Sequence, residues 1–194
     1  MEAEQSGLPV KPDGEHYRRV VPSPLPMKLL DHEMRALKLM TDAGCVVICA
    51  GGGGIPVVQD DATGKLVGVE AVIDKDRSAA MIGADLKADG LLILTDVAAV
   101  ATDYKKPQQK FIRSVSPRKL ESLMSHFPDG SMGPKCASAI DFVQRSGGWA
   151  AIGSLKEANE IVAGSAGTRI ENREGHEDFI EYYEEDPETF PNAA

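Results

Sequence analysis

Hydrophobic residues along the chain follow two patterns, one typical of helices and one typical of buried strands. Apolar side chains recur at three- and four-residue spacing over 27–43, and Gly44 follows as a stop signal. This spacing predicts an amphipathic helix. The next residues, 45–50, are wholly apolar and partly β-branched, which is typical of a strand covered on both faces. The first unit is therefore predicted to be a helix followed by a buried strand.

A second unit of the same kind follows farther along the chain. Asp74 is a residue type that caps helix N-termini, and the apolar positions after it predict a helix that ends near residue 87. The apolar run at 90–95 predicts a buried strand. Further predicted elements are a strand-like stretch at 69–73, a strand at 111–115, a short helix opened by Ser116 and Pro117, a helix after Gly133 and Pro134, a strand at 149–152, and a helix from a capping box at Ser154 and Glu157 to about Gly164. Alternating strands and helices predict an α/β fold, with helices on both sides of a parallel-rich central sheet.

The two ends of the chain differ in composition from the middle. Residues 1–26 are rich in proline and glycine and are predicted to be an extended lead-in to a folded domain at 27–170. Residues 171–194 hold nine acidic side chains and one arginine, and are predicted to form a solvated acidic tail. A short docked helix is the alternative, because three aromatic residues recur there at helical spacing: Phe179, Tyr182 and Tyr183.

The charge distribution excludes two classes of partner. The whole chain has a formal charge of −9 and the tail accounts for −8 of it, so residues 1–170 are nearly neutral. Binding to nucleic acid or to an anionic membrane needs clustered Lys and Arg, so neither partner is expected. No apolar run approaches the roughly 18–20 residues of a membrane helix, and the first residues lack a signal-peptide pattern. A cytoplasmic protein is therefore expected.

Cysteine and histidine give no sign of a metal or hydrolase site. The cysteines at 45, 49 and 136 are odd in number and lack zinc or redox spacing, so buried thiols are expected. The four histidines form no metal-ligand spacing, and no Gly-x-Ser-x-Gly nucleophile motif is present. No metal-ligating residues are predicted, and a hydrolase or metalloenzyme is disfavoured.

Four consecutive glycines, Gly51, Gly52, Gly53 and Gly54, follow the first predicted strand directly. Glycine allows bare backbone amides to approach a small anion. The run is neither a Walker A loop, because no Gly-Lys-Ser/Thr follows, nor a dinucleotide fingerprint, because Pro56 stands where its last glycine would be. An anion-binding loop and a simple hinge both remain open.

Two lysines lie at predicted helix starts. Lys75 stands between Asp74 and Asp76, where the partial positive charge of a helix N-terminus favours phosphate oxygens; an ordinary capped helix start is the alternative. Lys135 follows a segment with two glycines, a serine and a proline, and a lysine in a first turn opposes the helix dipole. A broken local rule of this kind indicates function. The last candidate is the loop at 95–107, for which a plain surface turn is the alternative. Together, the glycine run, the two lysines and this loop suit phosphoryl transfer.

Five sequence blocks, in the same order, resemble the carbamate kinase family: 18–24, 51–57, 68–76, 94–97 and 130–135. The resemblance covers roughly residues 8–170. It implies an amino-acid-kinase-like, three-layer fold and reversible phosphoryl transfer between carbamoyl phosphate and ADP, giving ATP and carbamate, with Mg²⁺. The family serves fermentative breakdown of arginine or ureides. Its N-terminal substrate-binding portion has no counterpart here, so a fragment, a truncated product or one chain of a split enzyme is expected, with a homodimer for a full-length chain.

The resemblance also implies roles for single residues. Lys75 and Lys135 would lie along the polyphosphate and stabilise the transferred group, and Asp76 would orient Lys75 or the Mg²⁺ shell. The four glycines of the loop would offer amides to carbamate or to the moving phosphoryl group. The residues expected to border the nucleotide are Thr95, Asp96, Val100, Tyr104, Met132 and Gly133. A non-catalytic nucleotide-binding module is the second hypothesis.

Overall fold

A computed structural model describes residues 31–128 and 130–187. These residues divide into two compact units, one that ends at Ser78 and one that begins at Ala79. The predicted lead-in at 1–26, the start of the predicted helix at 27–43 and the last residues of the acidic tail lie outside the described residues.

The first unit contains a helix and a small hairpin. Helix α1 (Asp31–Asp42) confirms the predicted helix over these residues, and its inward side chain is Leu37. Strands β1 (Val57–Gln59) and β2 (Leu66–Gly68) pair with each other in antiparallel orientation. In the turn between them, the Asp60 carboxylate accepts hydrogen bonds from the amide and hydroxyl of Thr63, both at 2.7 Å. These bonds favour the charged form and lower the pKa of Asp60.

The buried strand predicted at 45–50 does not form. Residues 45–49 are irregular, Ala50–Gly52 form a short 3₁₀ turn (η1), and the side chains of Val46 and Ile48 are 97% and 98% exposed. A strand is stable only when a neighbouring strand takes its backbone hydrogen bonds, and the β1–β2 pair accounts for the strands described in this unit. The stretch 69–73 is irregular for the same reason. Cys45 and Cys49 are consequently exposed, so the prediction of buried thiols is wrong for both.

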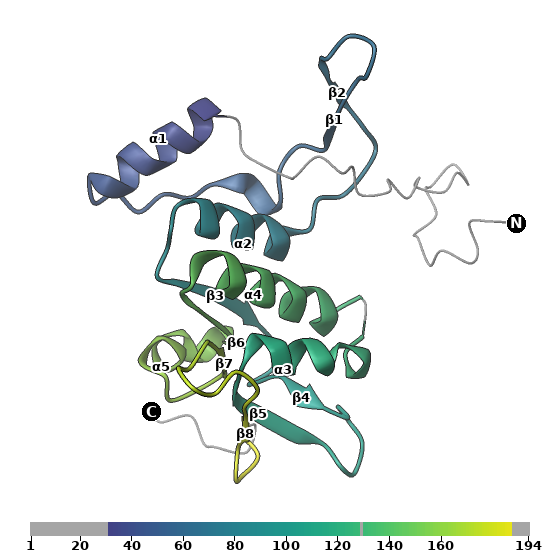
Figure 1. The fold of residues 1–194 in the computed structure, drawn as a ribbon, viewed down its shortest axis with the longest axis vertical. Coiled ribbons are helices and arrows are strands. Elements are labelled where there is room, and N and C mark those ends of the chain that lie inside the picture. Colours follow the sequence, from purple (N-terminus) through teal and green to yellow (C-terminus); the bar gives the residue numbers. More distant parts are fainter. Residues whose placement is uncertain (1–30, 129, 188–194) are drawn as a thin grey trace, which may run out of the picture. The chain divides into compact units, whose positions relative to one another are not determined.

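The second unit contains a six-stranded sheet in the order β3-β6-β7-β5-β4, with β8 added to β5 (Figure 1). Its strands are β3 (Gly90–Thr95), β4 (Ala101–Thr102), β5 (Lys110–Val115), β6 (Trp149–Ser154), β7 (Thr168–Ile170) and β8 (Ile180–Tyr182). The pairs β3/β6 and β5/β7 are parallel, whereas β6/β7, β4/β5 and β5/β8 are antiparallel. The predicted α/β fold with a parallel-rich sheet is confirmed, and the sheet is mixed.

Helices lie on both faces of this sheet. The helices are α2 (Lys75–Asp85), which crosses the boundary between the units, α3 (Pro117–Ser122), α4 (Met132–Ser146) and α5 (Ala158–Ala163), which follows a 3₁₀ turn, η3 (Leu155–Glu157). Ile152 of β6 joins the same buried cluster as α4 residues, whereas a Cβ on the next residue, Gly153, would lie 2.7 Å from Ile161 of α5. Successive strand residues face opposite sides of a sheet, so α4 and α5 cover opposite faces.

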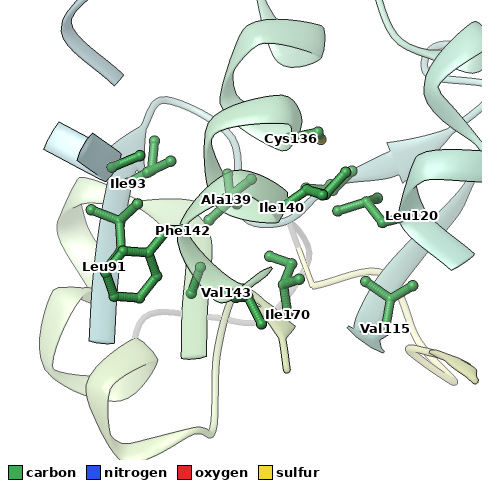
Figure 2. Close-up of a cluster of buried hydrophobic side chains, with 14 of the residues drawn as sticks. Leu91, Ile93, Val115, Leu120, Cys136, Ala139, Ile140, Phe142, Val143 and Ile170 are labelled. Carbon is green, nitrogen blue, oxygen red and sulfur yellow. The ribbon is translucent and has the colours of Figure 1, made fainter. Parts of the chain in front are cut away.

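Helix α4 supplies much of the hydrophobic core. Figure 2 shows side chains of α4 facing residues of the sheet and Leu120 of α3. The labelled members are Leu91, Ile93, Val115, Leu120, Cys136, Ala139, Ile140, Phe142, Val143 and Ile170. Burial in this apolar cluster disfavours the thiolate and raises the pKa of Cys136 to about 12. Cys136 is buried, as predicted, and a thiol in such surroundings is inert.

The acidic C-terminal segment, 171–187, is folded against the sheet. Strand β8 pairs with β5, the Tyr183 amide donates to the Phe111 carbonyl at 2.9 Å, and the Ser116 amide donates to the Phe179 carbonyl at 3.0 Å. The segment is therefore neither the solvated tail nor the docked helix that its composition predicted. The preference of the acidic side chains for solvent is outweighed, because Ile180 packs against the main core and Tyr183 against a smaller apolar cluster.

Arg173 fastens this segment to β5. Its guanidinium donates to the Ser114 hydroxyl at 2.7 Å, to Glu171 at 3.0 Å and to Glu181 at 2.7 Å. Burial alone would raise the pKa of Glu171, but hydrogen bonds and charge from Arg169 and Arg173 outweigh it, so the net shift is downward. The carboxylate is held in its charged form between two arginines.

Replacing Arg173 by alanine is expected to lower the free energy of unfolding by about 1–3 kcal/mol, because the buried hydroxyl of Ser114 loses its donor. The measurement is urea unfolding. Arg118→Ala is the control, since Arg118 and Glu177 lie 3.9 Å apart and are both exposed; its expected effect is within about 0.5 kcal/mol. Equal effects of the two substitutions would contradict this role of Arg173.

Candidate functional site

The glycine loop of the first unit is a tight turn of bare backbone. Gly51, Gly52, Gly53 and Gly54 all have positive φ angles, of 50°, 96°, 154° and 122°. Side-chain-bearing residues rarely adopt such values in succession. The Gly53 amide donates to the Ala50 carbonyl at 2.9 Å, and a Cβ at position 53 would lie 2.6 Å from the Ile73 carbonyl oxygen. The loop geometry thus requires glycine, and anion binding by its amides stays a prediction.

The start of α2 lies beside this loop. Asp74 caps the helix as predicted, because its carboxylate accepts from the Arg77 amide at 2.8 Å. The hydroxyl of the buried Ser78 lies 2.7 Å from the Gly53 carbonyl oxygen and 3.0 Å from the Asp74 carbonyl oxygen. One side chain therefore ties the loop to the first turn of the helix.

Lys75 and Asp76 occupy the first turn of α2 itself. The Lys75 ammonium lies 3.8 Å from the Asp76 carboxylate, and the lysine side chain is 64% exposed whereas Asp76 is largely buried. Because the lysine is so exposed, this ion pair adds little stability. The arrangement presents a cation to solvent next to the glycine loop, with a fixed carboxylate at its side.

Gly53→Ala is expected to detach the loop from α2, because the added Cβ clashes with the Ile73 backbone. Amide hydrogen exchange at Arg77 and Ser78 should accelerate by about tenfold or more, a cost of at least ~1.4 kcal/mol in local opening. Gly54→Ala is the control. It has a positive φ as well, but nothing lies within 4 Å of its added Cβ, so it carries only the conformational cost. Exchange rates that do not differ between the two variants would contradict this explanation.

In the second unit, Lys135 lies in the first turn of α4, which begins at Met132. The chain before the helix is tightly folded, because the Gly133 amide donates to the Pro128 carbonyl at 3.0 Å and a Cβ at Gly133 would lie 2.9 Å from that oxygen. Met132 packs against the core and Gly133 is buried. The helix start predicted after Gly133 is therefore confirmed to within two residues.

The start of α4 lies at the same end of the sheet as the last residues of β3 and β6. Helix α4 spans about 22 Å and β6 about 20 Å, and α4 packs against β6 after a connection of two glycines at 147 and 148. The helix therefore doubles back along the strand. Thr95 pairs with Ser154 in the parallel register of β3 and β6. Ligands of α/β proteins bind at this carboxyl edge, where Lys135, Thr95 and Asp96 are found.

The segment 95–104, which follows β3, is held in place by contacts with the core. The Thr95 hydroxyl donates to the Asp96 carboxylate at 3.0 Å. Val100 is fully buried in the main core, and its amide donates to the Thr168 hydroxyl at 2.8 Å. Tyr104 is 42% exposed, and the Lys105 ammonium lies 5.4 Å from its ring centroid. Thr95, Asp96 and Tyr104 thus reach the surface, whereas the side chain of Val100 supports the segment from the core.

Residues missed by the sequence analysis hold this segment in place. The Thr168 hydroxyl accepts from the Val100 amide and also donates to the Ile112 carbonyl. At Gly153, an added Cβ would lie 2.9 Å from Gly167 and 3.0 Å from the Ala98 carbonyl oxygen, so only glycine permits this close approach. The sequence carried no signal for either role, since both depend on residues far away along the chain.

The structure brings the predicted residues together in two groups. Within the first unit, the glycine loop adjoins Lys75 and Asp76. Within the second unit, Thr95 and Asp96 share one edge of the sheet with the residues at the start of α4. That Lys75 and Lys135 lie along one polyphosphate stays a prediction.

Among residues 31–128 and 130–187, no three His, Cys, Asp or Glu side chains come together as a ligand set. Mg²⁺ in phosphoryl-transfer sites is held by one or two carboxylates and by substrate phosphates, and the carboxylate of Asp76 suits such a role. In the same described part of the chain, no helix has the length and apolar character needed to cross a bilayer.

Comparison with known proteins points to one family. Residues 6–154 match the sequence model of the amino acid kinase family. A carbamate kinase from Haemophilus influenzae is 47% identical over 182 residues, 93% of this chain and 56% of that protein. The carbamate kinase of Escherichia coli strain K12 is 46% identical over 164 residues, 84% of this chain and 52% of the relative. The chain thus spans about half the length of the curated relatives it matches.

Solved structures agree with this relation. Carbamate kinase from Giardia lamblia bound to AMP-PNP superposes with a TM-score of 0.72 and 36% sequence identity, over 88% of this chain and 56% of that one. The α/β fold with a mixed sheet is therefore shared with a solved carbamate kinase. Because the family match extends over most of its length, from residue 6 to residue 154, the chain belongs to the amino acid kinase family.

Proposed function

We propose that the chain is the nucleotide-binding part of a carbamate kinase and acts in the reversible transfer of a phosphoryl group between carbamoyl phosphate and ADP. The observation that carries the proposal is the placement of Lys75 and Lys135, each in the first turn of a helix. One lies beside a loop of four positive-φ glycines, and the other at the carboxyl edge of a parallel strand pair. The similarity to carbamate kinases supports this assignment.

The reaction consists of one bond exchange at phosphorus. The bond between phosphorus and the carbamate oxygen breaks, and a terminal oxygen of the ADP β-phosphate forms the new bond, giving ATP and carbamate. Such a transfer is catalysed mainly by alignment and by neutralisation of the charge on the phosphoryl oxygens. Lys75 and Lys135 would supply that positive charge without proton transfer. The amides of the glycine loop would hold carbamate or the phosphoryl group from the other side.

Asp76 fits a supporting role in this chemistry. Its carboxylate is largely buried and lies 3.8 Å from the Lys75 ammonium, so it restrains the lysine near the loop. Mg²⁺ that accompanies the nucleotide would neutralise phosphate charge. The Asp76 carboxylate would suit the water shell of that ion.

On the nucleotide side, the proposal uses the carboxyl edge of β3. Thr95 and Asp96 end the strand, and Tyr104 lies on the exposed side of the same segment. Met132 and Gly133 begin α4 at that edge. A nucleotide bordered by these residues would direct its phosphates toward the first turn of α4, where Lys135 lies.

The second candidate is a non-catalytic nucleotide-binding chain, or one chain of a split enzyme. It is favoured by the exposed apolar segment 45–49, which has the pattern of a buried strand but no strand partner among the described residues. The chain also matches only 56% of the Haemophilus influenzae relative. The substrate-binding half of a complete enzyme would then come from another polypeptide.

A coupled assay for ATP formation from carbamoyl phosphate and MgADP, combined with ADP calorimetry, separates these candidates. Turnover by the chain supports the first. ADP binding without turnover supports the second, and absence of binding contradicts both.

As part of the same proposal, we expect the reaction to serve arginine or ureide breakdown in the cytoplasm, and a full-length chain to form a homodimer.

A further inference from the structure

The C-terminal segment beyond β8 reaches the segment that the proposed function assigns to the nucleotide. The ring of Tyr183 packs against a small buried cluster formed by Ala99, Ala101 and Phe111. Two of these three residues belong to the segment 95–104 itself. A residue from the acidic end of the chain therefore covers part of that segment.

Tyr183 also makes two hydrogen bonds that fix its position. Its amide donates to the Phe111 carbonyl at 2.9 Å, which extends the pairing of β8 with β5 by one residue. Its hydroxyl donates to the Gly167 carbonyl at 2.7 Å. Burial favours the neutral phenol and raises the pKa of Tyr183, despite an opposing effect of the Arg113 charge, so the hydroxyl keeps the proton that it donates.

The hydrogen bond to Gly167 connects Tyr183 indirectly with the same segment. Gly167 directly precedes Thr168, and the Thr168 hydroxyl accepts from the Val100 amide at 2.8 Å. The segment 99–101 is thus held through its side chains by the Tyr183 ring and through its backbone by Thr168. Tyr183 makes the first contact itself, and the second begins one residue after Gly167, whose carbonyl accepts from the Tyr183 hydroxyl.

We propose that the C-terminal segment 171–187 is a positioning element for the nucleotide, with Tyr183 as the positioning residue that holds 99–101 at the carboxyl edge of β3. This inference rests on the proposed function, because it assumes that ADP binds along 95–104. It gives a role to an acidic segment that its composition marked as a tail. Tyr183 itself touches no reacting atom and acts through the residues that it orders.

The test compares Tyr183→Ala, Tyr183→Phe and Tyr182→Ala by ADP calorimetry in the presence of Mg²⁺ and by amide hydrogen exchange. Tyr183→Ala is expected to weaken ADP binding about fivefold or more and to accelerate exchange at 99–102. Tyr183→Phe keeps the ring and should stay within about twofold of the parent. Tyr182→Ala is the matched control, since Tyr182 is a neighbouring, exposed aromatic residue that contacts Lys110 instead.

Each outcome decides the inference. If the parent binds ADP and Tyr183→Ala binds it equally well, or exchange at 99–102 is unchanged, the positioning role is wrong while the proposed function stands. If the parent does not bind ADP, the proposed nucleotide site is wrong and the inference falls with it. If Tyr182→Ala weakens binding as much as Tyr183→Ala, the effect is general loss of β8, and the role assigned to Tyr183 is wrong. Should Tyr183→Ala fail to fold, Tyr183→Leu replaces it under the same criteria.

Discussion

Replacing Lys135 or Lys75 by alanine is expected to lower the rate of ATP formation from carbamoyl phosphate and MgADP by about a hundredfold or more. Each substitution removes an ammonium group from the first turn of a helix, where it would neutralise charge that develops in the transition state. Rates of ATP formation are measured with the coupled assay, in a parent protein that shows turnover. If the chain binds nucleotide without turnover, the loss is measured as ADP affinity, with an expected weakening of about tenfold.

Each substitution has a matched control, which removes another lysine from the same unit. Lys87→Ala removes an exposed cation at the opposite, amino end of β3, and Lys65→Ala removes one from the β1–β2 hairpin. Both should stay within about twofold of the parent, because surface charges far from the site are screened. A Lys135→Ala or Lys75→Ala protein within the same twofold range would remove that lysine from the mechanism.

The second large effect concerns stability. Thr168→Val is expected to lower the free energy of unfolding by about 2–4 kcal/mol, because the Val100 amide and the Ile112 carbonyl would both lose a buried partner. Valine has nearly the same shape as threonine, so the loss reports the hydroxyl. The measurement is the urea midpoint at constant slope, with amide exchange at Val100 as a local readout.

Two controls accompany this substitution. Thr168→Ser keeps the hydroxyl and loses one methyl group, an expected cost of about 1 kcal/mol. Thr102→Val removes a hydroxyl that makes a weaker bond to Lys110, at 3.4 Å, and should cost less than about 1 kcal/mol. A Thr168→Val protein as stable as the Thr102→Val protein would show that the hydroxyl of Thr168 does not hold 95–104 in place.

Features governed by local rules could be predicted from the sequence. Asp74 caps α2, and Gly164 ends α5 in a left-handed conformation. Strands β3, β5 and β6 lie within two residues of their predicted bounds. In each of these cases, the deciding interactions lie within a few residues of the chain or in one continuous apolar run.

Features that depend on distant partners could not be predicted. The apolar pattern at 45–50 indicated a strand, but a strand also needs a neighbour that the described part of the first unit does not supply. The acidic composition of 171–187 indicated solvation, but pairing with β5 and the packing of Ile180 outweigh it. Thr168 is connected to Val100 and Ile112, 68 and 56 residues away, so its role was invisible in the sequence.

The candidate site residues could be predicted from helix starts and glycine loops. The residues that hold them in place could not. The contact of Ser78 with Gly53 across 25 residues fastens the glycine loop to α2, and Tyr183 and Gly153 fix the segment after β3. These are long-range contacts between ordinary residue types. Sequence patterns identify the groups that carry charge more readily than the groups that hold them in place.

A crystal structure of this chain with ADP and Mg²⁺ is the most direct measurement. The ammonium groups of Lys75 and Lys135 are expected within hydrogen-bonding distance of phosphate oxygens of the same bound nucleotide. A structure in which the two side chains point to separate surfaces, with ADP bound elsewhere or absent at saturating concentration, would contradict the proposed kinase site.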